Sequence, residues 1–165
     1  MKYISINRLQ DFEFHDSEFS LICFTEDLLK VRAKYLNIHS SAQQNACGLD
    51  MEIDEAIIEF RGFQVISYDN GKEFKINEIG EPRAVRPQVV FSGEEAKSRL
   101  YTQLKCGFVV LDLGIEDGGN YYMDANSFAP AAVGDLFFVT RFTFDSVTVS
   151  WDSYRKPAWY TEKRE

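Results

Sequence analysis

The 165-residue chain contains 45% hydrophobic and 27% charged residues, a balance typical of a globular protein and not of a disordered chain. Its length predicts a single domain, residues 1–165. The formal net charge of −8 disfavours binding to nucleic acid, whose phosphates attract basic surfaces, and most of this negative charge falls in residues 1–81.

The first predicted elements are two β-strands, over residues 17–25 and 28–38, joined by a tight turn at Glu26 and Asp27. Along the second strand hydrophobic residues alternate with basic ones, which is the period of two expected when one face is buried and the other solvated. The hydrophobic positions of this strand are Leu29, Val31, Ala33 and Tyr35. Polar residues 39–50 then predict a loop.

The middle of the chain predicts more strands and one helix. The hydrophobic phase shifts between Ile53 and Ala56, which indicates a β-bulge, and the turn sequence 69–71 (Asp-Asn-Gly) favours a type I′ hairpin. A helix is predicted over about residues 93–105. Its signals are a capping box formed by Ser92 and Glu95, hydrophobic residues at a spacing of four, and Gly107 after its end.

The last third returns to strands over residues 108–115, 121–125, 136–144 and 147–151. Turns at residues 117–119 and 145–146 predict hairpins between successive strands. Together these elements predict a mainly β fold, an antiparallel β-sandwich or strongly curved sheet with one packed α-helix.

Targeting signals and cofactor motifs are not evident. The first residues lack the apolar core of a signal peptide, and no stretch approaches the roughly 20 apolar residues of a membrane helix, so we expect a cytoplasmic protein without a membrane partner. Cys23, Cys47 and Cys106 are widely spaced, which favours reduced thiols over a zinc site. We expect neither a cofactor nor a metal.

The segment around His15 is the first candidate for chemistry, because a histidine there lies beside Asp16 and Glu18. Such a histidine can act as a general base or a metal ligand. In a strand, however, His15 and Asp16 would point to opposite faces. If the segment is a turn, Asp16 or Ser17 could cap backbone amides and His15 could brace the sheet edge. The structural interpretation is favoured over catalysis.

A second group of acidic residues lies at the start of the third predicted strand. Asp50, Glu52 and Asp54 recur at a spacing of two and are followed by Glu55. Carboxylates in this pattern could bind Ca²⁺, but the glycine and the terminal acid of an EF-hand loop are missing. A solvated or partner-facing acidic stripe is therefore favoured.

Aromatic residues near the end of the chain are candidates for binding. Trp151 continues an alternating strand and is expected in the core, whereas Trp159 and Tyr160 follow a proline. These two residues could either cover a sheet edge or stand exposed as aromatic anchors.

Motifs for common catalytic machinery do not occur. The chain lacks the serine-hydrolase elbow, the P-loop and the dinucleotide-binding glycine pattern. With only His15 and His39, a three-histidine zinc site is also excluded. Catalysis stays uncertain and is disfavoured.

The stretch Phe14-His15-Asp16-Ser17-Glu18-Phe19, followed by an alternating strand, a tight turn and a second strand, resembles the start of small bacterial β-rich families with an N-terminal His-Asp strand motif. Some of these families are immunity proteins of polymorphic-toxin systems. The resemblance covers about the first 40 residues. It implies a cytosolic protein that neutralises a toxin by binding it.

These observations favour a non-catalytic protein-binding module that docks an acidic face on a basic partner. The residues assigned to this face are Asp16, Glu18, Asp50, Glu52, Asp54, Glu55 and Glu59, with Trp159 and Tyr160 as anchors. One alternative is a small-molecule or carbohydrate-binding β-sandwich that uses the aromatic residues Tyr121, Phe128 and Trp159. Another is an enzyme built on His15. The oligomeric state is left open.

Overall fold

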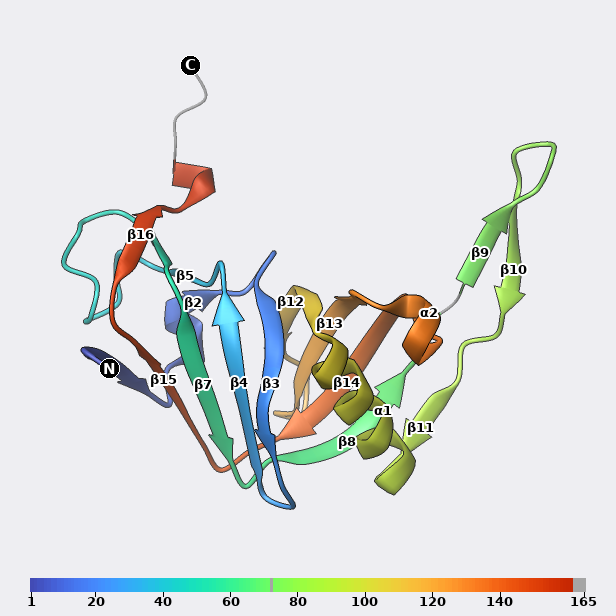
Figure 1. Ribbon diagram of the computed structural model, residues 1–165, viewed down its shortest axis with the longest axis horizontal. Coiled ribbons are helices and arrows are strands. Elements are labelled where there is room, and N and C mark those ends of the chain that lie inside the picture. The colour runs from blue at the N-terminus through green and yellow to red at the C-terminus, as the bar shows by residue number, and fades with distance from the viewer. Residues whose placement is uncertain (72, 162–165) are drawn as a thin grey trace.

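The computed structural model describes residues 1–71 and 73–161 and shows a mainly β protein built around one large antiparallel sheet (Figure 1). Ten strands pair in an order that differs from their order along the chain. Across the sheet they are β1 (Tyr3–Ile6), β15 (Ser146–Trp151), β7 (Ala56–Arg61), β4 (Leu28–Lys34), β3 (Glu18–Phe24), β12 (Phe108–Ile115), β13 (Tyr121–Ser127), β14 (Phe137–Thr143), β8 (Gln64–Asp69) and β11 (Val90–Ser92).

The sheet is strongly curved, as its connections require. Strands β7 and β8 are separated by only two residues in the chain, yet they are third and ninth in the sheet. Only a sheet that curls round on itself can bring these positions together. Figure 1 shows its two halves rising apart from a shared lower end. This confirms the predicted fold class.

The same curvature overturns two predicted hairpins. Strand β8 pairs with β14 and β11 instead of the strand that follows the Asp69-Asn70-Gly71 turn. Strands β14 and β15 are also not paired with each other, because β15 lies between β1 and β7. The hairpin between β12 and β13 is confirmed.

A second sheet of four short strands covers one end of the large one. In spatial order these strands are β16 (Tyr154–Pro157), β6 (Met51–Ile53), β5 (Asn37–Ile38) and β2 (Phe12–Glu13). The phase shift between Ile53 and Ala56, predicted to be a bulge, is the point where the chain leaves this sheet for β7 of the large sheet. Tyr35, predicted to be on the buried face, instead lies beyond β4 with a φ of 57° and is 39% exposed.

The predicted helix is α1 (Gly93–Cys106), which contacts β8, β3 and β11. It buries Ala96, Leu100 and Leu104 against the sheet, as their spacing predicted. Gly107 ends the helix with a positive φ of 83°, a conformation that favours glycine. The predicted capping box is wrong in one respect, since the Ser92 side chain makes no capping hydrogen bond.

The described secondary structure also includes three short helical segments, η1 (Leu9–Asp11), α2 (Pro130–Val133) and η2 (Trp159–Thr161), and a separate pair of strands, β9 (Glu73–Ile76) and β10 (Pro82–Arg86). No helix in residues 1–71 and 73–161 is long and apolar enough to cross a membrane.

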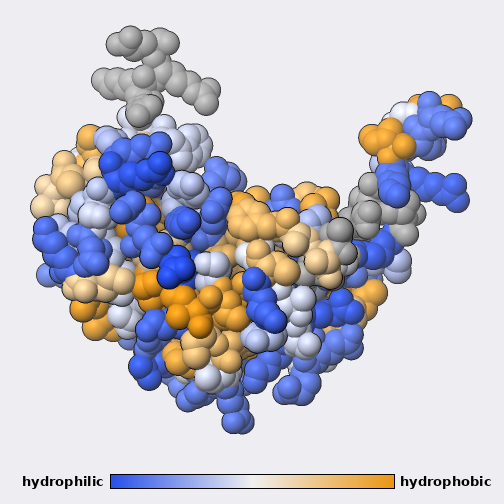
Figure 2. Space-filling view, viewed as in Figure 1, coloured by the Kyte–Doolittle hydropathy of each residue, from blue (hydrophilic) through white to orange (hydrophobic). Residues whose placement is uncertain are grey.

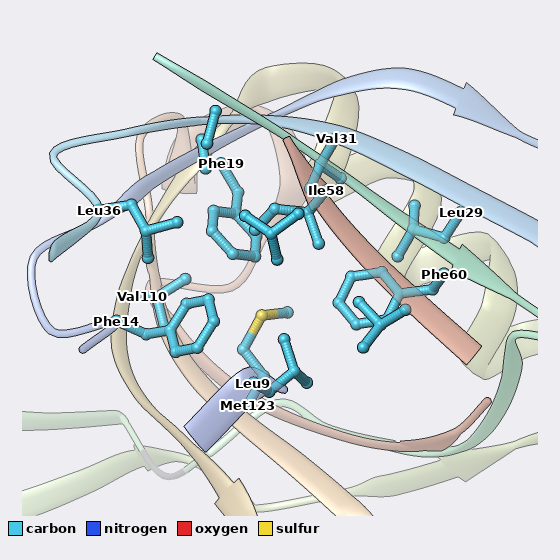
Figure 3. Close-up of a cluster of buried hydrophobic side chains, with 14 of the residues drawn as sticks. Leu9, Phe14, Phe19, Leu29, Val31, Leu36, Ile58, Phe60, Val110 and Met123 are labelled. Atoms are coloured by element: carbon cyan, nitrogen blue, oxygen red, sulfur yellow. The ribbon is translucent and has the colours of Figure 1, made fainter. Parts of the chain in front are cut away.

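The core lies inside the curve of the sheet. Figure 3 shows hydrophobic side chains from β3, β4, β7, β12, β13 and η1 meeting there. Phe60 of β7 contacts Phe63, Phe142 and Phe144, with ring centroids 5.9, 6.0 and 5.2 Å away. These aromatic contacts join β7 to the end of β14 through the core, so they hold the curvature of the sheet.

A buried polar network lies between α1 and strand β8 of the large sheet. Gln103 donates to the Tyr68 hydroxyl oxygen, and that hydroxyl donates to Oδ2 of Asp135, both over 2.9 Å. Arg86 and Arg99 pair with the same carboxylate over 2.9 and 3.5 Å. Asp135 is 2% exposed, so its charge depends on these two guanidinium groups. Burial and the nearby carboxylate raise the pKa of Tyr68.

Candidate functional site

The His15 segment is a turn that docks on β12. Ser17 N donates to Phe14 O over 2.9 Å, and Asp16 has a positive φ of 66°. Asp16 N donates to Val110 O, and Val110 N donates to Ser17 O, over 2.9 and 2.8 Å. The predicted turn is therefore confirmed, although among the described contacts neither the Asp16 nor the Ser17 side chain caps a backbone amide. The turn places His15 beside a strand almost 100 residues further along the chain.

His15 is held at the surface, and both of its ring nitrogens lie near an oxygen atom. Its Nδ1 lies 2.7 Å from Leu111 O, while Nε2 lies 3.6 Å from Asp16 Oδ1. The pKa of His15 is raised, mainly by the hydrogen bond to Leu111 O, with further contributions from the charges of Asp16, Glu13 and Asp112, while burial opposes the increase. The imidazole therefore lies in the negative electrostatic field of three carboxylates, those of Asp16, Glu13 and Asp112.

Strands β12 and β13 extend this acidic surface. Tyr122 donates to Asp112 Oδ2 over 2.5 Å. The pKa of Asp124 is raised by burial and then by the charge of Asp112. Gly114 permits the arrangement, because a Cβ there would lie 2.9 Å from the Tyr122 ring. We refer to Glu13, Asp16, Asp112 and Asp124 as the carboxylate cluster.

The carboxylate cluster differs from other acids of the protein in its partners. Among the described residues, no lysine or arginine forms an ion pair with any of its four members, whereas nearby Glu116 pairs with Arg141 over 2.9 Å. Asp16 and Asp112 are also exposed. Apart from the His15 imidazole near Asp16, no basic side chain among the described residues pairs with the cluster, so its negative charge is not matched there by lysine or arginine.

An apolar cleft opens beside the cluster, between the η1–β2 segment and the end of β12. Its volume is about 290 Å³. The lining is Leu9, Gln10, Phe12, Phe14, Leu113, Gly114, Ile115 and Tyr121, with one polar side chain among them. We refer to it as the β12 cleft. Asp112 and Leu113 are neighbours in β12, so their side chains lie on opposite faces of the strand, with the cleft on the face of Leu113 and the carboxylate on the other.

The wall of the β12 cleft includes an open strand edge. Strand β12 pairs with β13 along its length but with β3 only at Phe108 and Val109. Glu116 N donates to Asn120 O on the β13 side, so strand alternation directs the backbone groups of Leu113 and Ile115 to the opposite side. No strand of residues 1–71 and 73–161 pairs with that side, which leaves it available to an added strand.

The acidic stripe predicted from residue 50 onward does not form one solvated face. Glu52 is 5% exposed and pairs with Arg155 over 2.9 Å, so its predicted place on a docking surface is wrong. Glu55 pairs with Arg32 over 3.1 Å. Glu59 contacts two basic residues, Lys30 and Arg61. The strands pair in a register that places basic side chains opposite these acids.

The other predicted acids lie apart from one another. Asp54 is exposed and borders a polar hollow of about 530 Å³ between the two sheets, together with Lys34, Tyr35 and Arg155. Glu18 of β3 lies opposite Lys34 in the strand register. Of the predicted acids, Asp16 alone belongs to the carboxylate cluster.

Asp50 has a structural role at the edge of the second sheet. Its Oδ1 accepts a hydrogen bond from Ser40 N over 2.7 Å, and its Oδ2 lies 3.0 Å from His39 Nδ1 and 3.1 Å from the Tyr160 hydroxyl. Burial raises the pKa of Asp50, but the bonds from His39, Ser40 and Tyr160 outweigh it and lower the pKa from 3.8 to about 2.

We therefore expect Asp50→Asn to lower the free energy of unfolding by an amount that depends on pH. The folded protein binds the proton of Asp50 more weakly than the unfolded chain does, so this stabilisation is complete above about pH 4 and disappears as the pH falls towards 2. A lowering of nearly two pKa units corresponds to about 2 kcal/mol. Chemical unfolding across this pH range should show the difference between wild type and variant shrinking below about pH 4.

The control for this experiment is Asp54→Asn, an exposed residue of the same segment whose side chain forms no hydrogen bond in the described structure. It should follow the wild type at every pH. A constant difference between Asp50→Asn and the wild type would contradict the expected linkage.

The predicted aromatic anchors occupy different places. Trp159 and Tyr160 are 50% and 38% exposed at η2, and their rings meet edge to face with centroids 5.5 Å apart. Tyr160 is tied to Asp50 and lies at the second sheet. Phe128 lies against Gly107, whereas Tyr121 lines the β12 cleft. Thus Tyr121 alone of the predicted aromatic ligand-binding residues reaches that cleft.

The described residues contain no group of three histidine, cysteine, aspartate or glutamate side chains placed to hold a metal ion. Comparison of the chain with protein-family profiles, with curated proteins and with solved structures finds no match.

Asp112, Asp124 and the β12 cleft were not predicted from the sequence. A signal for Asp112 was present, since it interrupts the apolar run Val109-Val110-Leu111 at a register shift of β12. Asp112 lies near other carboxylates only because residues 14–17 dock on β12, and the sequence did not predict this docking.

Proposed function

We propose that this protein is a non-catalytic binding module that takes up an extended, basic and apolar segment of a partner protein at the β12 cleft. The observation that carries the proposal is the coincidence of an open strand edge, an apolar cleft and unneutralised carboxylates at one place.

The open edge accounts for the extended form of the segment. A strand added beside Leu113 and Ile115 would form main-chain hydrogen bonds with their outward backbone groups, as in other cases of strand addition. Its side chains would alternate between two sides. Apolar side chains on one side would enter the β12 cleft between Phe14 and Ile115.

The carboxylate cluster accounts for the basic character. Lysine or arginine side chains on the other side of the segment would meet Asp16 and Asp112. Charge complementarity of this kind mainly increases the rate and specificity of association, while the apolar contacts supply affinity. Neutralisation of a basic protein toxin, which the resemblance of the Phe14–Phe19 segment implies, belongs to the same proposal.

The proposal is tested with peptides of defined chemistry. A short peptide of alternating lysine and leucine should bind, and its glutamate–leucine counterpart should not. In NMR titrations, the lysine peptide should shift the amide signals of Phe14, Leu113 and Ile115, and should protect the amides of Leu113 and Ile115 from exchange. Because bound cations oppose protonation, the pKa of His15 should fall.

Matched variants show whether the charges act at this place. Asp16→Asn with Asp112→Asn should weaken binding of the lysine peptide by about tenfold at low salt and flatten its salt dependence. Glu26→Gln with Glu94→Gln, two exposed acids remote from the β12 cleft, removes the same charge and should leave binding nearly unchanged. Signal shifts confined to another surface, or equal binding of both peptides, would overturn the proposal.

A second candidate is a small amphipathic cation, because three aromatic side chains, Phe12, Phe14 and Tyr121, line the β12 cleft. An alkylammonium such as hexylamine tests it. Binding of hexylamine would shift the signals of these rings without protecting the amides of Leu113 and Ile115. Equally tight binding of hexylamine and the lysine peptide would favour this candidate.

A further inference from the structure

A two-stranded arm extends away from the body of the protein. It consists of β9 (Glu73–Ile76) and β10 (Pro82–Arg86), which pair with each other in a sheet of their own. Figure 1 shows the arm standing clear of the large sheet. All residues from Lys75 to Arg83 are exposed.

The arm presents apolar side chains to solvent. Ile76 is 73% and Ile79 77% exposed, and Figure 2 shows hydrophobic atoms among hydrophilic ones on the arm. Ile76 lies opposite Pro82 in the strand register. An isolated hairpin has no core and is only marginally stable in water, so such a surface gains stability when it is covered.

Buried polar groups fix the root of the arm. Asp69 accepts hydrogen bonds from Gly71 N and Gln88 Nε2, over 2.8 and 2.5 Å. Asn70 Oδ1 accepts from Val89 N over 2.8 Å, and Arg86 donates to Asn70 O over 3.0 Å while pairing with Asp135. These contacts hold both strands where they leave the body. The arm is therefore positioned before any partner arrives, which lowers the entropic cost of binding.

The turn of the arm is also ordered. Asn77 Oδ1 accepts hydrogen bonds from Ile79 N and Glu81 N, over 3.1 and 2.8 Å, and Asn77 N donates to Glu81 O over 2.9 Å. The turn thus holds Ile79 at the far end of the arm.

Charge is distributed unevenly along the arm. Lys75 lies opposite Arg83 in the register, a like-charge pair that destabilises a hairpin. Glu78 and Glu81 lie nearer the tip, in the turn. None of these four side chains forms an ion pair with another described residue. The arm is therefore basic in its middle and acidic at its tip.

We propose that the arm binds the same arm of a second copy of this chain, with the two arms side by side and antiparallel. In this arrangement the acidic tip of each arm, with Glu78 and Glu81, meets the basic pair of the other arm. The same contact between tip and basic pair therefore forms twice in the dimer. Ile76 and Ile79 of the two arms cover each other. Self-complementarity of charge argues for a second copy, because a uniformly basic or acidic partner would meet repulsion at one end.

A charge-exchange experiment tests this pairing in the full chain. One variant carries Lys75→Glu and Arg83→Glu, which makes the whole arm acidic. The other carries Glu78→Lys and Glu81→Lys, which makes it basic. Each variant alone should dimerise at least about tenfold more weakly than wild type, whereas an equimolar mixture should recover wild-type affinity as a heterodimer.

Sedimentation velocity over a concentration series up to about 100 µM measures the association. The controls are Lys97→Glu with Lys105→Glu, and Glu26→Lys with Glu94→Lys, which make the same charge changes outside the arm at positions that are exposed or, for Lys97, half-buried. Both controls should dimerise like the wild type. Ile76→Asp should abolish the dimer while leaving the unfolding midpoint of the body unchanged.

The proposal is overturned if the wild type stays monomeric throughout the series, or if mixing the two variants fails to restore association. The arm lies outside the β12 cleft, so peptide binding and dimerisation are measured independently and either can fail without the other.

Discussion

Asp135→Ala should lower the free energy of unfolding by about 3–5 kcal/mol. The carboxylate is 2% exposed and accepts contacts from Tyr68, Arg86 and Arg99. Without it, a buried hydroxyl and two partly buried guanidinium groups lose their common acceptor. Removing one member of a buried charged group costs more than the group itself contributes, because the remaining charges stay desolvated.

Urea or guanidinium unfolding followed by fluorescence measures this loss. Tyr68→Phe should cost about 1–2 kcal/mol, because it removes one hydrogen bond and leaves both ion pairs in place. Asp117→Ala, at an exposed turn, should change stability by no more than about 0.5 kcal/mol. A loss below about 1 kcal/mol for Asp135→Ala would mean that water molecules satisfy the groups that Asp135 contacts in the wild type.

Phe60→Ala should lower the free energy of unfolding by about 3–5 kcal/mol, because it removes the ring that joins the two halves of the curved sheet. Phe60 is 1% exposed and contacts Phe142 and Phe144 of the opposite half. The substitution therefore leaves a cavity and also releases the contacts that hold β7 near β14.

The same unfolding measurement, with two further variants, separates these effects. Phe60→Leu fills most of the cavity and should cost less than half as much as Phe60→Ala. Phe137→Ala removes a ring that is 46% exposed on β14 and should cost about 1 kcal/mol or less. Equal losses for Phe60→Ala and Phe137→Ala would show that the aromatic contacts between the two halves of the sheet do not stabilise the fold.

Local patterns predicted the elements well. The spacing of Ala96, Leu100 and Leu104 located α1, and the alternation of Leu29, Val31 and Ala33 identified the buried face of β4. These predictions succeeded because each depends on residues within one element.

The hairpin predictions at residues 69–71 and 145–146 failed for a common reason. A turn sequence reports that the chain reverses, but it does not report which strand the next segment meets. In this protein β8 and β15 meet strands remote in the chain, since curvature of the sheet brings other edges closer.

The acidic stripe of Glu52, Glu55 and Glu59 failed as a docking face because basic side chains of neighbouring strands neutralise it. The His15 segment was recognised as a turn candidate. Its association with Asp112 and Asp124 depends on residues about 100 positions away.

The sequence by itself determined the strand and helix propensities, the mainly β class, the buried faces and the negative net charge, because each follows from composition or from short-range periodicity. The tertiary structure decided the strand order, the curvature, the pairing of acids with bases and the β12 cleft. These features arise from contacts between segments far apart in the chain, where several pairings satisfy the same local pattern and packing of the whole core selects one.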